Sequence, residues 1–105
     1  MATVLVIKQL ASGTVTIARN PIYTAPAATS TIVNDITFIN TSAATSQVVN
    51  VWVNDQRVVP VDLVLLPKYM LVLDDVITLG SGDEVFASTT TASILDYVVN
   101  GVEET

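Results

Sequence analysis

Four acidic residues offer this chain its best prospect of chemistry. They form two pairs, Asp74-Asp75 and Asp83-Glu84, each close to a turn signal in the sequence. Ca²⁺ takes oxygen ligands, so two such pairs meeting across a turn could in principle hold that ion. The spacing is not that of an EF-hand loop, however, and adjacent residues of a strand face opposite ways. We therefore expect solvated turn acids, with no metal and no cofactor.

The remaining routes to catalysis lack their central residues. The sequence contains no His and no Cys, which excludes Ser-His-Asp and Cys-His catalysis and the commonest zinc ligand. A pair of carboxylates can cleave a glycosidic bond, but that reaction needs a cleft with aromatic side chains, and only 6% of the residues are aromatic. Gly80-Ser81-Gly82 precedes neither a Lys-Ser/Thr pair nor a predicted helix, so it indicates a hairpin turn. We expect a protein that is not an enzyme.

Charge argues against two classes of partner. The net charge is −6, and the four basic residues Lys8, Arg19, Arg57 and Lys68 are scattered along the chain. Binding to phosphate backbones or to anionic lipid needs a cluster of Lys and Arg. We expect neither a nucleic acid nor a membrane as partner.

Low charge combined with many apolar residues points to assembly. Half of the residues are hydrophobic and only 13% are charged, whereas about 25% is usual. A chain of 105 residues cannot hide so much apolar surface within itself, which favours burial against other subunits. A Val- and Thr-rich β domain with neutral polar faces is the alternative. Trp52 is predicted either to pack in the core or to make a subunit or ligand contact.

Segment length and turn spacing predict an all-β fold. Short apolar or alternating segments follow one another at intervals of roughly ten residues, separated by Gly, Pro or small polar residues. We expect one domain, residues 1–105, forming a single antiparallel, jelly-roll-like β-sandwich of eight or nine short strands. The expected strands are 2–9, 14–18, 22–26, 30–40, 47–54, 57–66 with a kink at Pro60, 69–74, 83–89 and 93–102.

The longest of these strands, 30–40, should carry one covered face. Strict alternation places the mainly large and apolar side chains on one face and a mixed set on the other. The expected faces are Ile32, Asn34, Ile36 and Phe38 against Val33, Asp35, Thr37 and Ile39.

The N-terminal residues 1–9 are a candidate subunit contact. Val4 and Val6 would lie on one face of this strand and Leu5 and Ile7 on the other, so both faces need cover. The strand is expected either inside its own fold or added to a neighbouring subunit's sheet, and the low charge favours the neighbour. The predicted interface residues are Val4, Leu5, Val6, Ile7 and Trp52.

Several turn and strand positions together carry a family resemblance. They are Tyr23-Thr24-x-Pro26, Ile32-x-x-x-Ile36-x-x-x-Asn40-Thr41-Ser42, Leu79-x-x-Gly82-Asp83 and Gly101-x-Glu103. Over Ile22 to Glu103 the chain resembles a group of small β-sandwich virion proteins of tailed bacteriophages. It departs from that pattern at Ala27-Ala28 and Lys68-Tyr69, where a glycine is expected, and its first twenty residues lie outside it.

The resemblance implies a structural part of the virion, assembled in the bacterial host cytoplasm. The first expectation is a capsid decoration or cement protein, a homotrimer that binds the major capsid protein on a preformed shell. A tail, neck or fibre component of the same particle is the second. A carbohydrate-binding β-sandwich module is the third, and it would need a platform of aromatic side chains.

Overall fold

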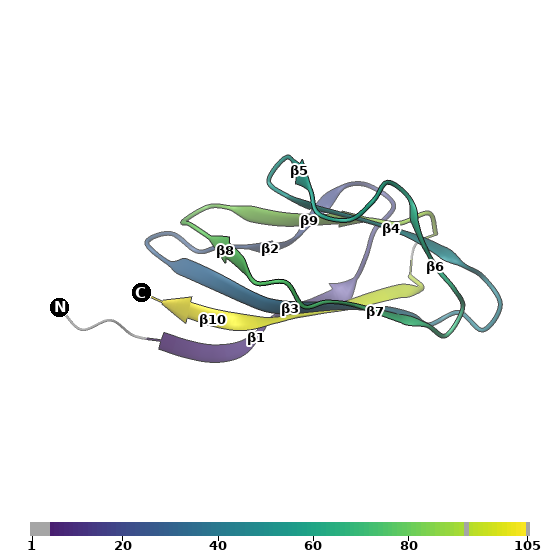
Figure 1. Cartoon of the computed structure of the whole chain (residues 1–105), viewed down its shortest axis with the longest axis horizontal. Coiled ribbons are helices and arrows are strands. Elements are labelled where there is room, and N and C mark those ends of the chain that lie inside the picture. The colour runs from purple at the N-terminus through teal and green to yellow at the C-terminus, as the bar shows by residue number, and fades with distance from the viewer. Residues whose placement is uncertain (1–4, 92, 105) are drawn as a thin grey trace.

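The protein is a β-sandwich of two antiparallel sheets, seen in a computed structural model that describes residues 5–91 and 93–104 (Figure 1). The described residues form ten strands and no helix, which confirms the all-β expectation. The strands are β1 (Leu5–Thr14), β2 (Asn20–Thr24), β3 (Ser30–Asn40), β4 (Gln47–Val53), β5 (Gln56–Arg57), β6 (Leu63–Leu65), β7 (Met70–Leu73), β8 (Ile77–Leu79), β9 (Glu84–Ser88) and β10 (Leu95–Glu104). Within this part of the chain, no helix has the length and apolarity needed to cross a membrane.

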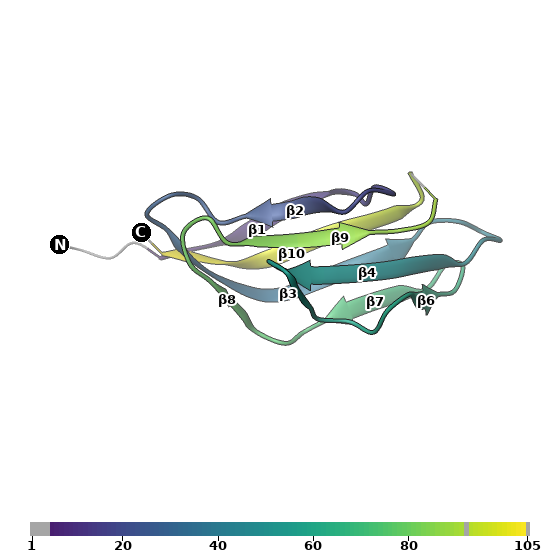
Figure 2. The same ribbon diagram turned by 90° about the horizontal axis from the view of Figure 1, so that it is seen from above.

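The strand order is that of a jelly roll. Sheet A has the order β1-β10-β3-β7, with β8 also paired to β3, and sheet B has the order β2-β9-β4-β5, with β6 also paired to β4. Each of the pairs β5/β6 and β7/β8 is one interrupted edge strand, so each sheet has four strand positions. The chain then passes repeatedly from one sheet to the other, and the N- and C-terminal strands lie side by side in sheet A (Figure 2).

The core lies between the sheets and is made chiefly of β-branched and leucine side chains. From β3 come Val33, Ile36 and Phe38, and from β4 come Val49 and Val51, all of them fully buried. Residues Leu79, Val85, Leu95 and Val99 meet them from the other strands. Burial of these side chains is the main favourable contribution to folding, at about 25 cal/mol per Å² of apolar surface.

A β-bulge in β3 overturns part of the expected alternation. Asn100 pairs with Asp35 but Gly101 pairs with Val33, so Asn34 is an extra residue. Such an insertion reverses the faces of all residues before it. Val33 is therefore buried and Ile32 is 43% exposed, although Ile36, Phe38, Thr37 and Ile39 face as expected.

The expected strand 14–18 was also wrong. Strand β1 continues through residues 11–13 as far as Thr14, opposite Asp96. Val15 then donates its N–H to the Leu95 carbonyl at 2.8 Å and buries its side chain, while the flanking residues are exposed. A polar-apolar alternation around one buried valine marks here a crossing from sheet A to sheet B. The expected strand 57–66 is likewise broken, because Pro60 lies between β5 and β6.

The N-terminal strand belongs to its own fold. Residues Leu5, Val6, Ile7 and Lys8 pair with residues 104 to 101 of β10, at the edge of sheet A. Of the two arrangements expected from the sequence, inclusion in its own sheet is observed. No strand of the described chain pairs with the other side of β1, so contact of that side with a neighbouring subunit stays a prediction. The predicted interface residue Val4 lies outside the described residues.

Candidate interaction surface

The two acidic pairs do not form one site. Asp83 accepts a hydrogen bond from the Gly80 N–H at 2.9 Å, and Glu84 accepts one from the Thr24 hydroxyl at 2.9 Å. Asp74 and Asp75 are exposed on the connection between β7 and β8. Within residues 5–91 and 93–104, no three acidic side chains gather in a way that could hold a metal ion.

Trp52 lies on the outer face of sheet B rather than in the core. Its neighbours across the strands are Phe86 on β9 and Arg57 on β5. The guanidinium groups of Arg57 and Arg19 lie 4.7 and 4.8 Å from the indole centroid, and that of Arg19 also lies 4.4 Å from the centroid of Phe86. These are cation–π contacts within the chain, so the aromatic pair is partly covered by its own arginines.

Hydrogen bonds fix both guanidinium groups in place. Arg57 donates to the Asn50 side-chain oxygen at 2.6 Å, and that oxygen also accepts the Asp62 N–H at 3.0 Å. Arg19 donates to the Asn54 carbonyl and forms an ion pair with Asp55 at 3.3 Å. The arrangement accounts for two of the chain's four basic residues as packing elements on sheet B.

Exposed apolar side chains are concentrated along one edge of the sandwich. Of the eleven large apolar residues that are exposed among residues 9–91 and 93–104, eight lie between residues 58 and 76. This segment runs from the end of β5 through β6 and β7 to the start of β8, and so forms the β5–β8 side of both sheets. We call these residues the apolar edge: Val58, Val61, Val64, Leu66, Tyr69, Met70, Val72 and Val76.

Interruption of the edge strand of sheet B exposes part of this set. Val58 still donates its N–H to Val51 on β4 at 3.0 Å, but Pro60 cannot donate and Asp62 has a positive φ of 54°. Pairing to β4 resumes only at Leu63. Regular strand pairing to β4 is therefore lost over residues 59–62, and Val61 is exposed there.

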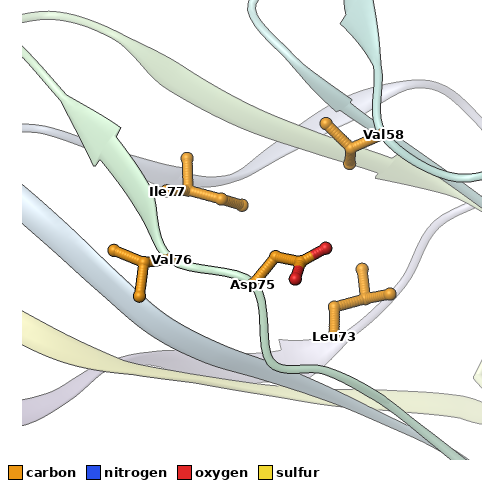
Figure 3. Close-up of a pocket in the computed structure, with 5 residues that line it drawn as sticks. All are labelled: Val58, Leu73, Asp75, Val76 and Ile77. Atoms are coloured by element: carbon orange, nitrogen blue, oxygen red, sulfur yellow. The ribbon is translucent and has the colours of Figure 1, made fainter.

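Between the two interrupted edges lies a hollow of about 320 Å³. It is lined by Val58, Leu73, Asp75, Val76 and Ile77. Figure 3 shows the Asp75 carboxylate directed into this hollow among aliphatic side chains. Two residues of the apolar edge, Val58 and Val76, thus line a hollow that also contains an acidic group.

Strand β7 forms the sheet A part of the edge. Met70 and Val72 pair with Ile39 and Thr37 of β3, and their side chains are 61% and 48% exposed. No strand of the described chain pairs with the other side of β7. Natural proteins usually protect such edges with charges, prolines or bulges, and Met70–Leu73 contains no charged residue and no proline. An apolar, unprotected edge of this kind is typical of an interaction surface.

The residues behind the family resemblance have structural roles. The Tyr23 hydroxyl donates to Glu103 at 2.7 Å and is 2.9 Å from the Thr31 hydroxyl, which links the two sheets. Burial raises the pKa of Tyr23 to about 12, and the neighbouring Glu103 adds to that rise while the Thr31 hydrogen bond opposes it. Gly82 lies in a turn with a φ of +81°, and its N–H donates to the Ala25 carbonyl at 3.0 Å. These motif positions therefore connect and shape the two sheets of the sandwich.

Asn40 and the two turns that lack the expected glycine also have structural roles. The buried Asn40 amide donates to the carbonyls of Thr45 and Leu65 at 2.8 and 3.0 Å, and its oxygen accepts the Ser42 N–H at 3.0 Å. At the turns where the family pattern has glycine, Ala28 and Lys68 have positive φ values of 56° and 65°. Both turns therefore adopt the left-handed conformation that glycine favours, although neither residue is a glycine.

Comparison with models of protein families and with curated proteins finds no match. The resemblance to phage virion proteins therefore remains an expectation that rests on the motif positions alone.

Sequence reasoning placed the interface at residues 4–7 and Trp52 and missed the apolar edge. A signal was present: residues 69–73, Tyr-Met-Leu-Val-Leu, are apolar on both faces, between Lys68 and Asp74. The same property drew attention to the N-terminal strand, and the topology places both strands at edges of sheet A.

Proposed function

We propose that this chain is a non-enzymatic structural protein of a tailed-bacteriophage virion, specifically a decoration protein that binds the outside of the head shell. The observation that carries the proposal is the apolar edge. A single 105-residue domain that exposes eight large apolar side chains along one edge is suited to be covered by another protein.

The energetics suit a repetitive lattice. Each apolar contact contributes about 25 cal/mol per Å² buried, so a modest patch gives weak binding on its own. Contact with two neighbouring capsomers at once multiplies the affinity through effective concentration. The jelly roll supports the proposal only by analogy, because viral capsid proteins share this architecture with lectins.

Two observations disfavour the carbohydrate-binding alternative. The chain has one tryptophan, and two guanidinium groups lie over its ring. A sugar that stacked on Trp52 would have to displace Arg19 or Arg57 from contacts that each arginine also supports with hydrogen bonds.

The deciding experiment locates and counts the protein in intact virions, by electron cryomicroscopy and by quantitative mass spectrometry against the major capsid protein. A decoration protein occurs on the head in numbers comparable with the capsid protein. A small copy number at the tail or neck would support the tail, neck or fibre alternative instead.

A second experiment tests the surface. Val61 and Val64 are 65% and 58% exposed on the sheet B part of the apolar edge. Their replacement by lysine should leave the fold intact and abolish binding to undecorated heads in a sedimentation assay. As a control, Ile17→Lys places the same charge on an exposed residue outside the edge and should leave binding unchanged.

A further inference from the structure

Alternate residues of β7 direct their backbone N–H and C=O groups away from β3. Asn40 donates its N–H to the Tyr69 carbonyl at 3.0 Å, so the backbone of Tyr69 faces β3. Because this direction alternates along a strand, Leu71 and Leu73 also face β3, whereas Met70 and Val72 direct their N–H and C=O groups away from it. In the described chain no strand receives those outward groups.

Charges flank β7 in a self-complementary order. Lys68 precedes the uncharged residues 69–73, and Asp74 and Asp75 follow them. When such a segment lies antiparallel to an identical segment, the basic end of each meets the acidic end of the other. Lys68 is one of only four basic residues in a chain of net charge −6, so its position on this edge matters for any contact between two copies.

We propose that β7 pairs with β7 of a second copy of this chain across a two-fold axis at Leu71. The two A sheets then form one continuous sheet through the dimer. In this register Met70 lies opposite Val72 of the second copy, and both are residues whose backbone groups face outward. Each such pair exchanges two hydrogen bonds, and the axis generates the pair twice.

Side chains agree with the same register. Met70 and Val72 lie on the outer face of sheet A, and Ile39 lies beside Met70 on β3. Around the axis these residues of both copies form one apolar patch. Lys68 lies in the turn before β7 and Asp74 directly after the strand, so this register brings the Lys68 end of each copy to the Asp74 end of the other, at either end of the patch.

A second copy is favoured over an unrelated protein because the edge complements itself. A two-fold interface uses the same surface on both partners, so any apolar or charged feature must match its own rotated image. This edge matches its own rotated image in three respects: the direction of its backbone groups, its apolar side chains and its charges. The resulting dimer takes the place of the homotrimer that the family resemblance implies, and it does not depend on the proposed function.

The first test is the mass of the full-length protein by light scattering over a range of concentrations. We expect a concentration-dependent dimer of the 11.1 kDa chain. Lys68→Asp and Asp74→Lys should each raise the dimer dissociation constant on the order of tenfold, since two attractive contacts become repulsive. The double exchange should restore dimerisation. Aspartate tolerates the left-handed conformation at position 68, so the single variant should remain folded.

The second test blocks the backbone edge. Val72→Pro removes an N–H that faces away from β3, so the variant should remain folded, with an unchanged circular dichroism spectrum, and should be monomeric. Val64→Lys, on the edge of sheet B, should remain a dimer. A wild-type protein that is monomeric at all concentrations, or trimeric, would overturn the proposal, as would a folded Val72→Pro variant that still dimerises.

A third test reads the register. The chain has no cysteine, so an introduced one can cross-link only to its counterpart. Leu71→Cys on the axis places two Cα atoms about 4.5 Å apart, within disulfide range. Leu73→Cys places its counterpart several residues away. Oxidation should cross-link the first variant and not the second, and the reverse pattern would refute this register.

Discussion

The hydroxyl of Tyr23 donates a 2.7 Å hydrogen bond to the carboxylate of Glu103, and this bond joins sheet B to sheet A. Tyr23 is on β2, and Glu103 is on β10 opposite Thr31, whose hydroxyl also contacts the phenol. Tyr23 is only 8% exposed, so its deprotonation would place a negative charge in a poorly hydrated position beside a carboxylate.

Stability should therefore fall at alkaline pH. The pKa of Tyr23 is about 12 in the folded protein, against 10.0 for an ordinary tyrosine. Between these values the unfolded chain binds fewer protons than the folded one, so rising pH favours unfolding. The contribution is complete below pH 10 and decreases by up to about 2 kcal/mol as pH approaches 12. Urea unfolding on either side of this window measures it.

Tyr23→Phe isolates the effect. The variant should lose about 1–2 kcal/mol at neutral pH, since it removes a hydrogen bond to a charged group. It should also show a smaller alkaline decrease, with a residual slope because burial raises the pKa of Tyr97 as well. Tyr69→Phe, at an exposed tyrosine, is the matched control and should change neither quantity. An unaltered alkaline decrease in Tyr23→Phe would contradict the assignment.

Alternation and turn spacing were sufficient to predict the sandwich, because every strand with a covered face needs that pattern. They could not predict the bulge at Asn34. The bulge lies beside Gly101 of the partner strand, whose backbone approaches Ile32 so closely that no Cβ would fit. Similarly, the alternation of 14–18 is the same in a strand and in a crossing, and only pairing distinguishes them.

The candidate surface was harder to predict than the fold. Apolar residues on both faces of a strand show that it needs cover, but they do not show which strand lies uncovered at an edge. That property follows from strand order, which in the described chain leaves β1 and β7 each without a partner on one side. The exposure of Met70 and Val72 then directs attention to β7. Trp52 was predicted to pack in the core or to contact a subunit or ligand. In the structure, two arginines of the same chain lie over its ring.

Gly101→Ala should be strongly destabilising. A Cβ at this position would lie 2.1 Å from the Ile32 carbonyl oxygen, so the backbone of β3 or β10 would have to move. We expect a loss of at least about 2 kcal/mol in the free energy of unfolding. Gly80→Ala is the control, because the nearest atom to its Cβ would be 3.5 Å away and its φ is not positive. An equal loss of stability in the two variants would show that the close approach of Gly101 to Ile32 is not the reason for the loss.

Asn40→Ala should have an effect of similar size for a different reason. The side chain is 1% exposed and satisfies the Leu65 and Thr45 carbonyls and the Ser42 N–H. Its removal leaves buried polar groups without partners, at a cost of about 2–4 kcal/mol. Thermal or urea unfolding measures the loss, and the exposed Asn34→Ala serves as control. A loss as small as that of the control would mean that water replaces the amide.

Removal of residues 1–9 tests which of two strands, β1 or β7, joins the subunits. Residues 5–9 pair with 100–104 inside sheet A, so the shortened protein loses half of a strand and should be clearly less stable. Its oligomeric state should be unchanged, because β1 and β7 lie at opposite edges of that sheet. Light scattering and urea unfolding of the same sample measure both properties. A shortened protein of unchanged stability that has become monomeric would show instead that the N-terminal strand, and not β7, joins the subunits.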